Sequence, residues 1–486
     1  MERVMGRIRR GSLFFNVTTL VSAQAVVKLL NFAVSIAVVR YLGTQELGRY
    51  AYILAFAYPF GALADFGLAT YAIREMSRDR AREEEVVAIL QRALLWLAGL
   101  GWVAMMGLAT LLPHDATILA CLALAGCSSL LSAITTPLLV LLTAREDLHL
   151  VSLYQVVASL LGSAATMTVL LLGGTSLALL MAATMANGVL LAIAHVFVEQ
   201  KPSLPRVQFT SIQCMVREAL PFGLLLLGFA LYYRVDMTML QWLRTEEEVG
   251  NYAAAYRFLD VVIPLAASIG RPFYPRLSGI TGRDPQGVRD LLEATWRPLL
   301  ALGLPLSFGT VYVAEPLTIA LFGSDFTDAG RLLQILIWGS IPLFLITIPT
   351  QALMAANLVL PLAGVYGLSV AVNVLANFFL IPQWGAGGAA CATVLCEWLN
   401  LVLVVRIVRR KFSVSLAGQG LWRYILAAVA MVSVLWTIQG YGLTVEIFFG
   451  AMAYCAALLM LGCVRLHDVA ALKRFFQTAN VWKPRA

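Results

Sequence analysis

Hydrophobic stretches long enough to cross a lipid bilayer recur about every 30 to 40 residues along the whole of this chain. Apolar residues make up 60% of the 486 residues and charged residues only 13%, which excludes an ordinary soluble domain. A hydrocarbon core of about 30 Å requires about 20 helical residues. Breaks at Gly, Pro and charged residues predict fourteen spans, near 12–39, 48–73, 86–112, 115–143, 149–172, 175–198, 213–242, 249–276, 290–314, 329–356, 359–381, 385–408, 421–440 and 443–464. The predicted fold class is an all-α polytopic membrane protein.

The distribution of positive charge predicts the orientation of these spans. Most of the 35 Lys and Arg residues fall in the N-terminus, in the loops after even-numbered spans and in the C-terminal tail. The opposite loops carry Arg40, Arg49, Arg244 and Arg331. The positive-inside rule then predicts that both termini lie in the cytoplasm. We expect a multi-pass protein of the plasma (inner) membrane. The net charge of +8 follows from this topology, and without a basic domain we expect no nucleic-acid partner.

Catalytic and metal-binding patterns are not evident in the sequence. The longest polar stretches, about 199–212 and 277–289, are too short to fold as domains. The seven cysteines lie in spans or on the predicted cytoplasmic side, so we expect no disulfide framework. The four histidines are isolated, so we expect no metal site. The first span is too long for the core of a cleavable signal peptide. These features argue against an enzyme with its chemistry in a soluble loop, and we expect no catalytic residues.

The second half of the chain repeats the first at the turn after its first span. Residues 42–51 read LGTQELGRYA, and residues 243–253 read LRTEEEVGNYA. The shared Gly-x-Tyr-Ala recurs 202 residues later, and Tyr154 corresponds loosely to Tyr366. A repeat of six spans preserves orientation, so the halves should be related by an axis along the membrane normal. The predicted domains are 1–210 with helices 1–6, 211–410 with helices 7–12, and 411–486 with two accessory helices and a cytoplasmic tail.

Short motifs form a recognisable set over about residues 10–410. They are 39–43 with 47–50, 65–68 with Arg74, 221–222, 234–236, 249–252 with 256–257, 321–323, and 385–390 with Glu397. This set resembles the oligosaccharide flippase (polysaccharide transporter) branch of the multidrug/oligosaccharidyl-lipid/polysaccharide exporter superfamily. The resemblance is specific for the branch and not for a substrate. It implies two six-helix lobes in a V around a central cavity, and the last two spans resemble the accessory pair of many members.

Three basic residues lie at a similar depth inside the predicted spans, where a charge costs about 2.5–3.5 kcal/mol on insertion scales. They are Lys28 in the first span, Arg234 in the seventh and Arg257 in the eighth. We predict that these cations line the cavity and bind substrate. A lysine that snorkels and a structural ion-pair network are the alternative explanations.

Three carboxylates accompany these cations. Asp236 is two residues from Arg234, and Asp260 can pair with Arg257 at i,i+3 spacing. Glu397 lies midway through the twelfth span. Each is a candidate partner for an arginine or a candidate coupling site for H⁺ or Na⁺, and we expect no other cofactor.

Uncharged polar side chains form two stripes. Gln24 and Asn31 share one face of the first span with Lys28, and Asn373 and Asn377 share one face of the eleventh. These four side chains are candidate contacts for sugar hydroxyls. Hydrogen bonds between helices explain the second stripe equally well.

Together, the resemblance and the cations predict a flippase for an isoprenoid-diphosphate-linked oligosaccharide, since arginine offers bidentate donors to a diphosphate. The resemblance implies transport from the cytoplasmic to the outer leaflet by alternating access, for surface polysaccharide or glycan assembly. Membrane lipids and glycan-assembly proteins are the other expected partners. One alternative is a cation-coupled exporter of drugs or small molecules, which would favour an acidic cavity. Another is an integral-membrane glycan polymerase or ligase, which would carry one large outer loop.

Overall fold

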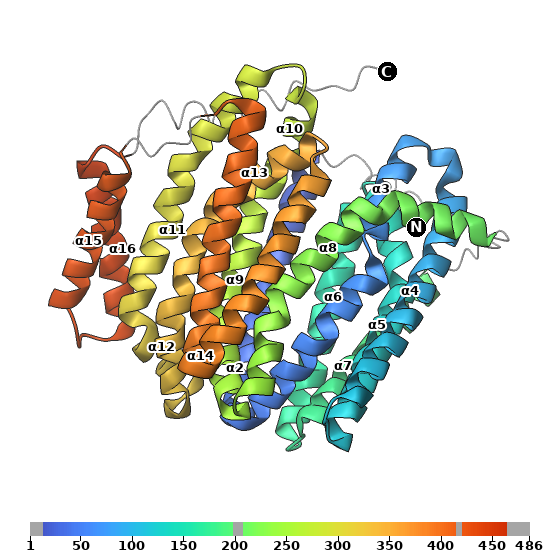
Figure 1. Cartoon of the computed structure of the whole chain (residues 1–486), viewed down its shortest axis with the longest axis horizontal. Coiled ribbons are helices and arrows are strands. Elements are labelled where there is room, and N and C mark those ends of the chain that lie inside the picture. Colours follow the sequence, from blue (N-terminus) through green and yellow to red (C-terminus); the bar gives the residue numbers. More distant parts are fainter. Residues whose placement is uncertain (1–12, 198–207, 415–419, 464–486) are drawn as a thin grey trace. The chain divides into compact units, whose positions relative to one another are not determined.

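The computed structural model describes residues 13–197, 208–414 and 420–463, without the side chains of 13–26, 28, 29 and 194–197. Within these ranges the regular structure consists of α-helices and four short 3-10 turns (Figure 1). The chain divides into two compact units, Met1–Thr238 and Met239–Ala486. The prediction of an all-α, multi-span protein is confirmed. The predicted domain limits rest on the sequence repeat, whereas the two units are defined by compactness. The predicted limits therefore stay predictions.

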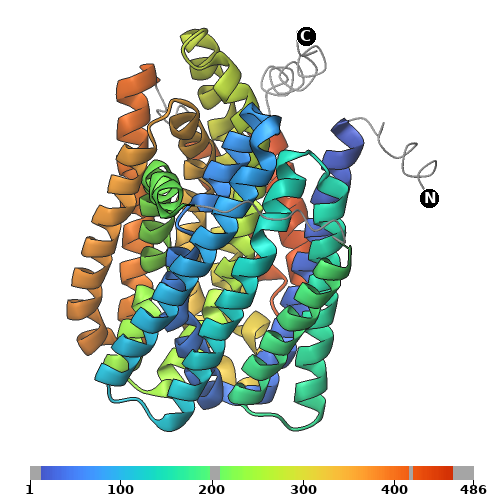
Figure 2. The same cartoon turned by 90° about the vertical axis from the view of Figure 1, so that its right-hand side faces the viewer.

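The N-terminal unit is built from six helices and most of a seventh. They are α2 Leu13–Asp65, α3 Leu68–Arg78, α4 Glu83–Leu111, α5 Ala116–Ala144, α6 Leu148–Leu171, α7 Ser176–Phe197 and α8 Phe209–Leu243. The helices α4 and α5 pack as one hairpin, and α6 and α7 pack as another. Both hairpins turn at the same end of the unit (Figure 2). The loops 112–115 and 172–175 therefore share one side, as predicted for loops after odd-numbered spans.

The C-terminal unit takes in the end of α8 and eight further helices. They are α9 Glu246–Gly270, α10 Tyr274–Ile280, α11 Pro285–Phe322, α12 Thr327–Leu336, α13 Ser340–Ala355, α14 Val359–Phe412, α15 Leu421–Thr437 and α16 Leu443–Met460. The last two helices pack against each other, and both contact α11.

Two of the helices are too long to be single spans. Among the described residues, 11 continuous helical stretches are long and apolar enough to cross a membrane, and α15 is apolar but shorter. The helices α2 and α14 each consist of two segments joined at a kink, at Gly43 and at Gly385. A straight helix of the 54 residues of α14 would measure about 80 Å, more than twice the hydrocarbon thickness. The glycine kinks therefore divide these helices into shorter spans, while the total of fourteen stays a prediction.

The sequence around helix ends explains where the helices begin and end. The Asp115 carboxylate accepts a hydrogen bond from the Ile118 amide at 2.7 Å and caps α5. Asp284 caps α11 in the same way, and Pro285 follows at the first helical position. The first turn of α9 is acidic and the last turn of α14 is basic, which suits the helix dipole.

Three predicted spans contain a break: 249–276 and 329–356 each include a short 3-10 turn, and 48–73 includes a break with left-handed backbone. The span predicted at 48–73 is interrupted, because α2 ends at Asp65 and α3 begins at Leu68. The residues between them, Phe66 and Gly67, have φ angles of 41° and 72°, in the left-handed region that ends a helix. The Asp65 carboxylate accepts a hydrogen bond from the Ala69 amide at 3.2 Å. It therefore satisfies one of the free backbone amides in the first turn of α3.

Close packing against α8 holds this break in place. A Cβ atom on Gly67 would lie 2.6 Å from the Cβ of Phe222, and one on Gly223 would lie 2.7 Å from the Phe66 ring. Two short motifs of the sequence, 65–68 and 221–222, therefore meet in the N-terminal unit, and glycine is required where they touch.

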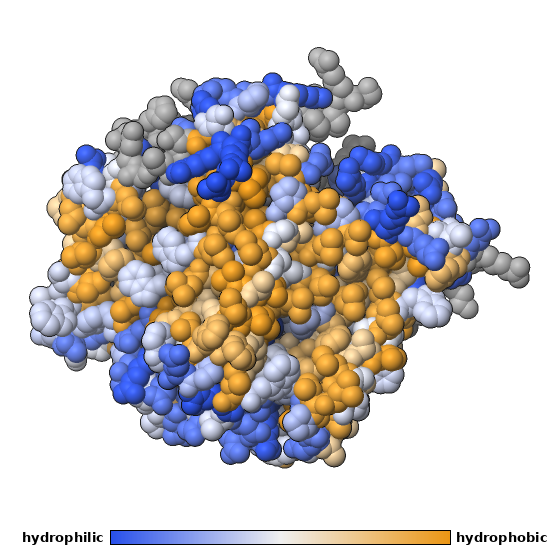
Figure 3. All heavy atoms as spheres, viewed as in Figure 1, coloured by the Kyte–Doolittle hydropathy of each residue, from blue (hydrophilic) through white to orange (hydrophobic). Residues whose placement is uncertain are grey.

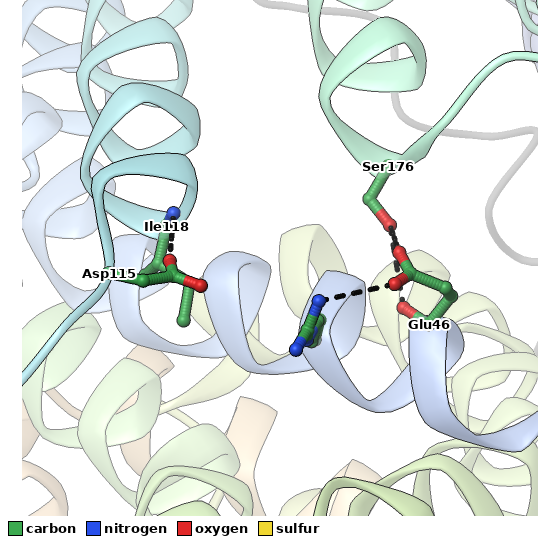
Figure 4. A network of polar contacts seen from close by, with 5 residues as sticks. Glu46, Asp115, Ile118 and Ser176 are labelled. Atoms are coloured by element: carbon green, nitrogen blue, oxygen red, sulfur yellow. Dashed lines mark hydrogen bonds and ion pairs between the residues drawn. The ribbon is translucent and has the colours of Figure 1, made fainter.

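In the first repeat, a hydrogen bond connects the turn after the first span with the first turn of α7, which is distant in the sequence. The Glu46 carboxylate accepts a hydrogen bond from the Ser176 hydroxyl at 2.9 Å, at the beginning of α7, and pairs with Arg49 at 3.4 Å. Figure 4 shows this contact, with the Asp115 cap of α5 near it. Glu46 thus joins two loops on the same side of the unit.

The second repeat places a glutamate at the matching position, Glu248. Its carboxylate accepts a hydrogen bond from the Ala386 amide at 3.0 Å, directly after the kink at Gly385. The Arg244 guanidinium donates to the carbonyls of Ile381 and Pro382, at 3.0 and 2.7 Å, before the kink. The turn between α8 and α9 therefore satisfies backbone groups on both sides of the break in α14.

We predict that Gly67→Ala destabilises the protein by at least about 2 kcal/mol, because the new Cβ meets α8 and the left-handed φ becomes strained. The matched control is Gly61→Ala, since Gly61 lies in the interior of α2 and a Cβ there meets nothing within 4 Å. Thermal unfolding of the purified protein in detergent measures both variants. Equal melting temperatures for the two would show that the contact with α8 is not needed.

Candidate substrate-binding site

The predicted site residues are distributed over both units. Arg234 and Asp236 lie in the N-terminal unit, on α8. Arg257 and Asp260 lie on α9, and Asn373, Asn377 and Glu397 lie on α14, all in the C-terminal unit. The side chains of Lys28 and Gln24 are outside the described residues, although both positions belong to α2. The grouping of the three cations therefore stays a prediction.

Two aromatic rings hold the Arg234 guanidinium. Its central carbon lies 4.5 Å from the ring centroid of Tyr233 and 5.8 Å from that of Tyr58. Tyr233 in turn stacks on Phe229, with centroids 5.5 Å apart and rings inclined by 12°. A cation over an aromatic face gains about 0.5–2 kcal/mol, more where water is excluded. The rings of Tyr58 and Tyr233, whose centroids are 6.0 Å apart, thus form one aromatic surface beside the guanidinium.

Asp236 is buried, with only 1% of its surface exposed. One carboxylate oxygen accepts a hydrogen bond from the Met237 amide at 2.7 Å. Residues two apart on a helix point in different directions, so Asp236 and Arg234 belong to different faces of α8. The pair is therefore adjacent in sequence without sharing one helix face.

Arg257 and Asp260 form the predicted i,i+3 ion pair on α9. The Nη1 and Oδ2 atoms are 3.7 Å apart, and the two side chains are 21% and 25% exposed. At this distance the pair is weak. Within the described part of the chain, the buried Nε of Arg257 has no hydrogen-bond acceptor. This arginine therefore carries a desolvated donor that the described protein groups leave unsatisfied.

The second polar stripe lies inside the packing of α14. Asn373 and Asn377 are 1% and 0% exposed, and the Asn377 amide donates to the Asn373 carbonyl oxygen at 2.7 Å. One turn away, the Ser369 hydroxyl donates to Asn400 across the kink of α14 at 2.6 Å. The remaining amide atoms Nδ2 of Asn373 and Oδ1 of Asn377 have no partner among the described residues. The contact between Ser369 and Asn400 fits the interhelical explanation of this stripe.

The two remaining predicted residues have different surroundings. Asn31 is exposed on α2 and accepts a hydrogen bond from the Ser159 hydroxyl of α6 at 2.8 Å. Glu397 is 9% exposed and packs beside Gly339, where a Cβ would lie 3.5 Å from its Cγ. Asn31 therefore links two helices of the N-terminal unit, whereas Glu397 is enclosed in the C-terminal one.

Two residues of the arginine site were not predicted from the sequence. Tyr233 is the neighbour of Arg234, and its aromatic ring could have been considered as a stacking partner. Tyr58 lies on α2, far away in the sequence, and no local pattern connects it with Arg234. Among the described residues, no group of three His, Cys, Asp or Glu side chains could hold a metal ion.

Comparison with protein families gives two matches that overlap at the start of the C-terminal unit. Residues 13–281 match the family described as "Polysaccharide biosynthesis protein". Residues 249–460 match the family described as "Lipid II flippase MurJ". The first match covers more than half of the chain.

Curated relatives are similar over part of their length. The chain is 25% identical over 247 residues to a probable low-salt glycan biosynthesis flippase, Agl15, of Haloferax volcanii, and this match covers 49% of the chain and 52% of the relative. It is 27% identical over 241 residues to the probable flippase AglR of the same organism, covering 47% and 50%. The matched region therefore spans about half the length of these relatives.

Solved structures share the fold. The lipid II flippase MurJ in an inward closed conformation superposes with a TM-score of 0.77 at 12% identity, covering 90% of this chain and 97% of that one. A multidrug resistance MATE family transporter of the MOP superfamily, in an inward-facing conformation, superposes with a TM-score of 0.65 at 14% identity, covering 80% and 94%. The predicted multi-span helical transporter fold is confirmed, and the arrangement of two six-helix lobes in a V around a central cavity stays a prediction.

We predict that Asn373→Ala and Asn377→Ala each lower the free energy of unfolding by about 1–3 kcal/mol, because each leaves a buried amide partner unsatisfied. The double variant should lose less than the sum of the two, since it removes both members of one hydrogen bond. Denaturant unfolding of the purified protein in mixed micelles measures this cycle. Strictly additive losses would contradict the coupling.

Proposed function

The chain belongs to the polysaccharide biosynthesis protein family, and we propose that it moves an isoprenoid-diphosphate-linked oligosaccharide from the cytoplasmic to the outer leaflet of the inner membrane by alternating access. The relatives named as flippases support a lipid-linked glycan as the cargo. The two fold neighbours support a transporter architecture. The cargo headgroup would enter from the cytoplasm, while its isoprenoid tail stays in the bilayer.

Arg257 is the observation that carries this proposal. Its guanidinium is mostly buried, its ion pair with Asp260 is long, and its Nε has no acceptor among the described residues. A diphosphate offers several anionic oxygens, and a guanidinium can donate to two of them at once. An anionic headgroup would therefore satisfy a donor that otherwise costs free energy.

Arg234 and Lys28 are the other proposed contacts of the diphosphate. The contact with Tyr233 and Tyr58 supports this assignment for Arg234, because a guanidinium restrained by neighbouring side chains loses less entropy when an anion binds. Lys28 is included for its predicted depth in the membrane. Gln24, Asn31, Asn373 and Asn377 stay candidate sugar contacts.

The membrane potential is the proposed source of energy for this transport. With the cytoplasm negative, moving one anionic charge outward is favourable by about 2.3 kcal/mol per 100 mV. Asp236, Asp260 and Glu397 are the proposed H⁺ or Na⁺ sites if transport is also coupled to a cation. Both termini are proposed to be cytoplasmic, and glycan-assembly proteins are proposed partners.

We predict that Arg257→Ala lowers the rate of lipid-linked oligosaccharide transport at least about tenfold, the effect of losing one hydrogen bond between charged groups. Arg257→Lys should restore part of the rate, because it keeps the charge but not the bidentate donor geometry. The measurement is mass spectrometry of isoprenoid-linked glycans in a deletion strain that carries each variant. The untransported, complete oligosaccharide should accumulate in the Arg257→Ala strain.

Arg331→Ala is the matched control, because Arg331 is an exposed arginine that pairs with Asp328 at 3.0 Å. Its strain should match the wild type. No accumulation in the deletion strain itself, with unchanged surface glycan, would reject the flippase assignment in favour of a small-molecule exporter on the same fold. Accumulation in the deletion strain but not with Arg257→Ala would reject only the role of Arg257.

A further inference from the structure

A groove runs between α11 and the second half of α14 in the C-terminal unit. It has a volume of about 490 Å³, and its lining includes Trp296 from α11 and Val402 and Val405 from α14. Val402 is 59% exposed, so the floor of the groove presents apolar surface. Figure 3 shows hydrophobic surface over this unit that borders a hydrophilic patch at one end. An apolar groove on a membrane-spanning unit is suited to a hydrocarbon chain.

Three arginines, Arg406, Arg409 and Arg410, line one end of the same groove. All three are exposed, and among the described residues none of them forms a hydrogen bond or an ion pair through its side chain. Val402, Arg406 and Arg409 follow at spacings of four and three residues and therefore share one face of α14. The groove thus changes from apolar to strongly basic within two helical turns.

Favourable interaction with the helix dipole explains only part of this cluster. Basic residues in the last turn of a helix are stabilised by its C-terminal carbonyls, which accounts for Arg409 and Arg410. Arg406 lies before the last turn, and it lines the groove together with the other two. Three like charges on neighbouring turns repel one another, and an anion that lies between them lowers this repulsion.

We propose that this groove binds an anionic glycerophospholipid, with one acyl chain against Trp296 and Val402 and the headgroup phosphate at Arg406, Arg409 and Arg410. The positive-inside rule predicts that this end of α14 faces the cytoplasm, so the lipid would come from the inner leaflet. Arginine matches a phosphate through paired donors, and the groove supplies the apolar surface that free phosphate does not need. The proposal does not depend on the transport function.

Native mass spectrometry of the full-length protein in detergent tests this site, with dioleoyl-phosphatidylglycerol and dioleoyl-phosphatidylcholine as probes. The wild type should bind the anionic lipid about tenfold more tightly than the zwitterionic one. The triple variant Arg406→Gln, Arg409→Gln, Arg410→Gln should reduce this ratio to about one. The corresponding triple lysine variant should keep part of the preference, because it keeps the charge.

The matched control is the triple variant Arg74→Gln, Arg78→Gln, Arg80→Gln, which removes the same charge from exposed arginines outside the groove. It should keep the wild-type preference, and an equal loss would show that net charge alone attracts the lipid. Phosphatidylglycerol with brominated acyl chains should quench part of the tryptophan fluorescence of the wild type. This part should be missing in Trp296→Phe, which would place the acyl chain beside Trp296. Quenching that is identical in wild type and Trp296→Phe would overturn the proposed position.

Two competition experiments distinguish other phosphate-bearing ligands. Inorganic phosphate, compared with chloride at equal ionic strength, should leave the lipid preference unchanged. If it abolishes the preference, the arginines bind free phosphate and the proposal fails. Displacement by an isoprenoid diphosphate at far lower concentration than by phosphatidylglycerol would also overturn it, because the groove would then belong to the substrate path.

Discussion

The hydrocarbon core of the membrane offers no hydrogen-bond partners, so each interruption of a helix requires the protein to satisfy the exposed backbone groups. The kink of α14 joins two predicted spans, and the exposed backbone groups beside it are satisfied in the same way. Arg244 donates to carbonyls before the break at Gly385, and Glu248 accepts from the amide after it. The interruption between α2 and α3 uses Asp65 as a cap and close glycine packing against α8. At each of these breaks, side chains of the protein satisfy backbone groups that the interrupted helix leaves unpaired.

The same constraint governs the charges inside the bundle. Arg234 lies against the rings of Tyr233 and Tyr58, and the Asp236 carboxylate accepts a backbone hydrogen bond. Arg257 is different, because its ion pair is long and one of its buried donors has no acceptor in the described part of the chain. A charge that the protein leaves partly unsatisfied is a position where an anionic ligand gains binding free energy. This is why Arg257, more than the better-stacked Arg234, supports the proposed function.

Much of the fold could be predicted because hydropathy and charge bias are local properties. The hairpin turns, the ion pair of Arg257 with Asp260, and the shared helix face of Asn373 and Asn377 all follow from spacing along one segment. The break at Phe66 and Gly67 was not predicted in this way, because the apolar residues continue on both sides of Asp65 and Gly67 and predict one uninterrupted span. Its left-handed backbone is stabilised by contact with Phe222 and Gly223, which are distant in the sequence.

The sequence by itself determined that the chain is a multi-span helical membrane protein, where its charged residues lie along the spans, and which exporter family it resembles. Only the tertiary structure decided the surroundings of those residues: Tyr58 over Arg234, Glu248 at the kink of α14, and the basic groove beside Trp296. The physical reason is the range of the interactions. Helix formation and membrane insertion depend on neighbours within a few turns, whereas stacking, capping across helices and groove shape depend on which helices pack together.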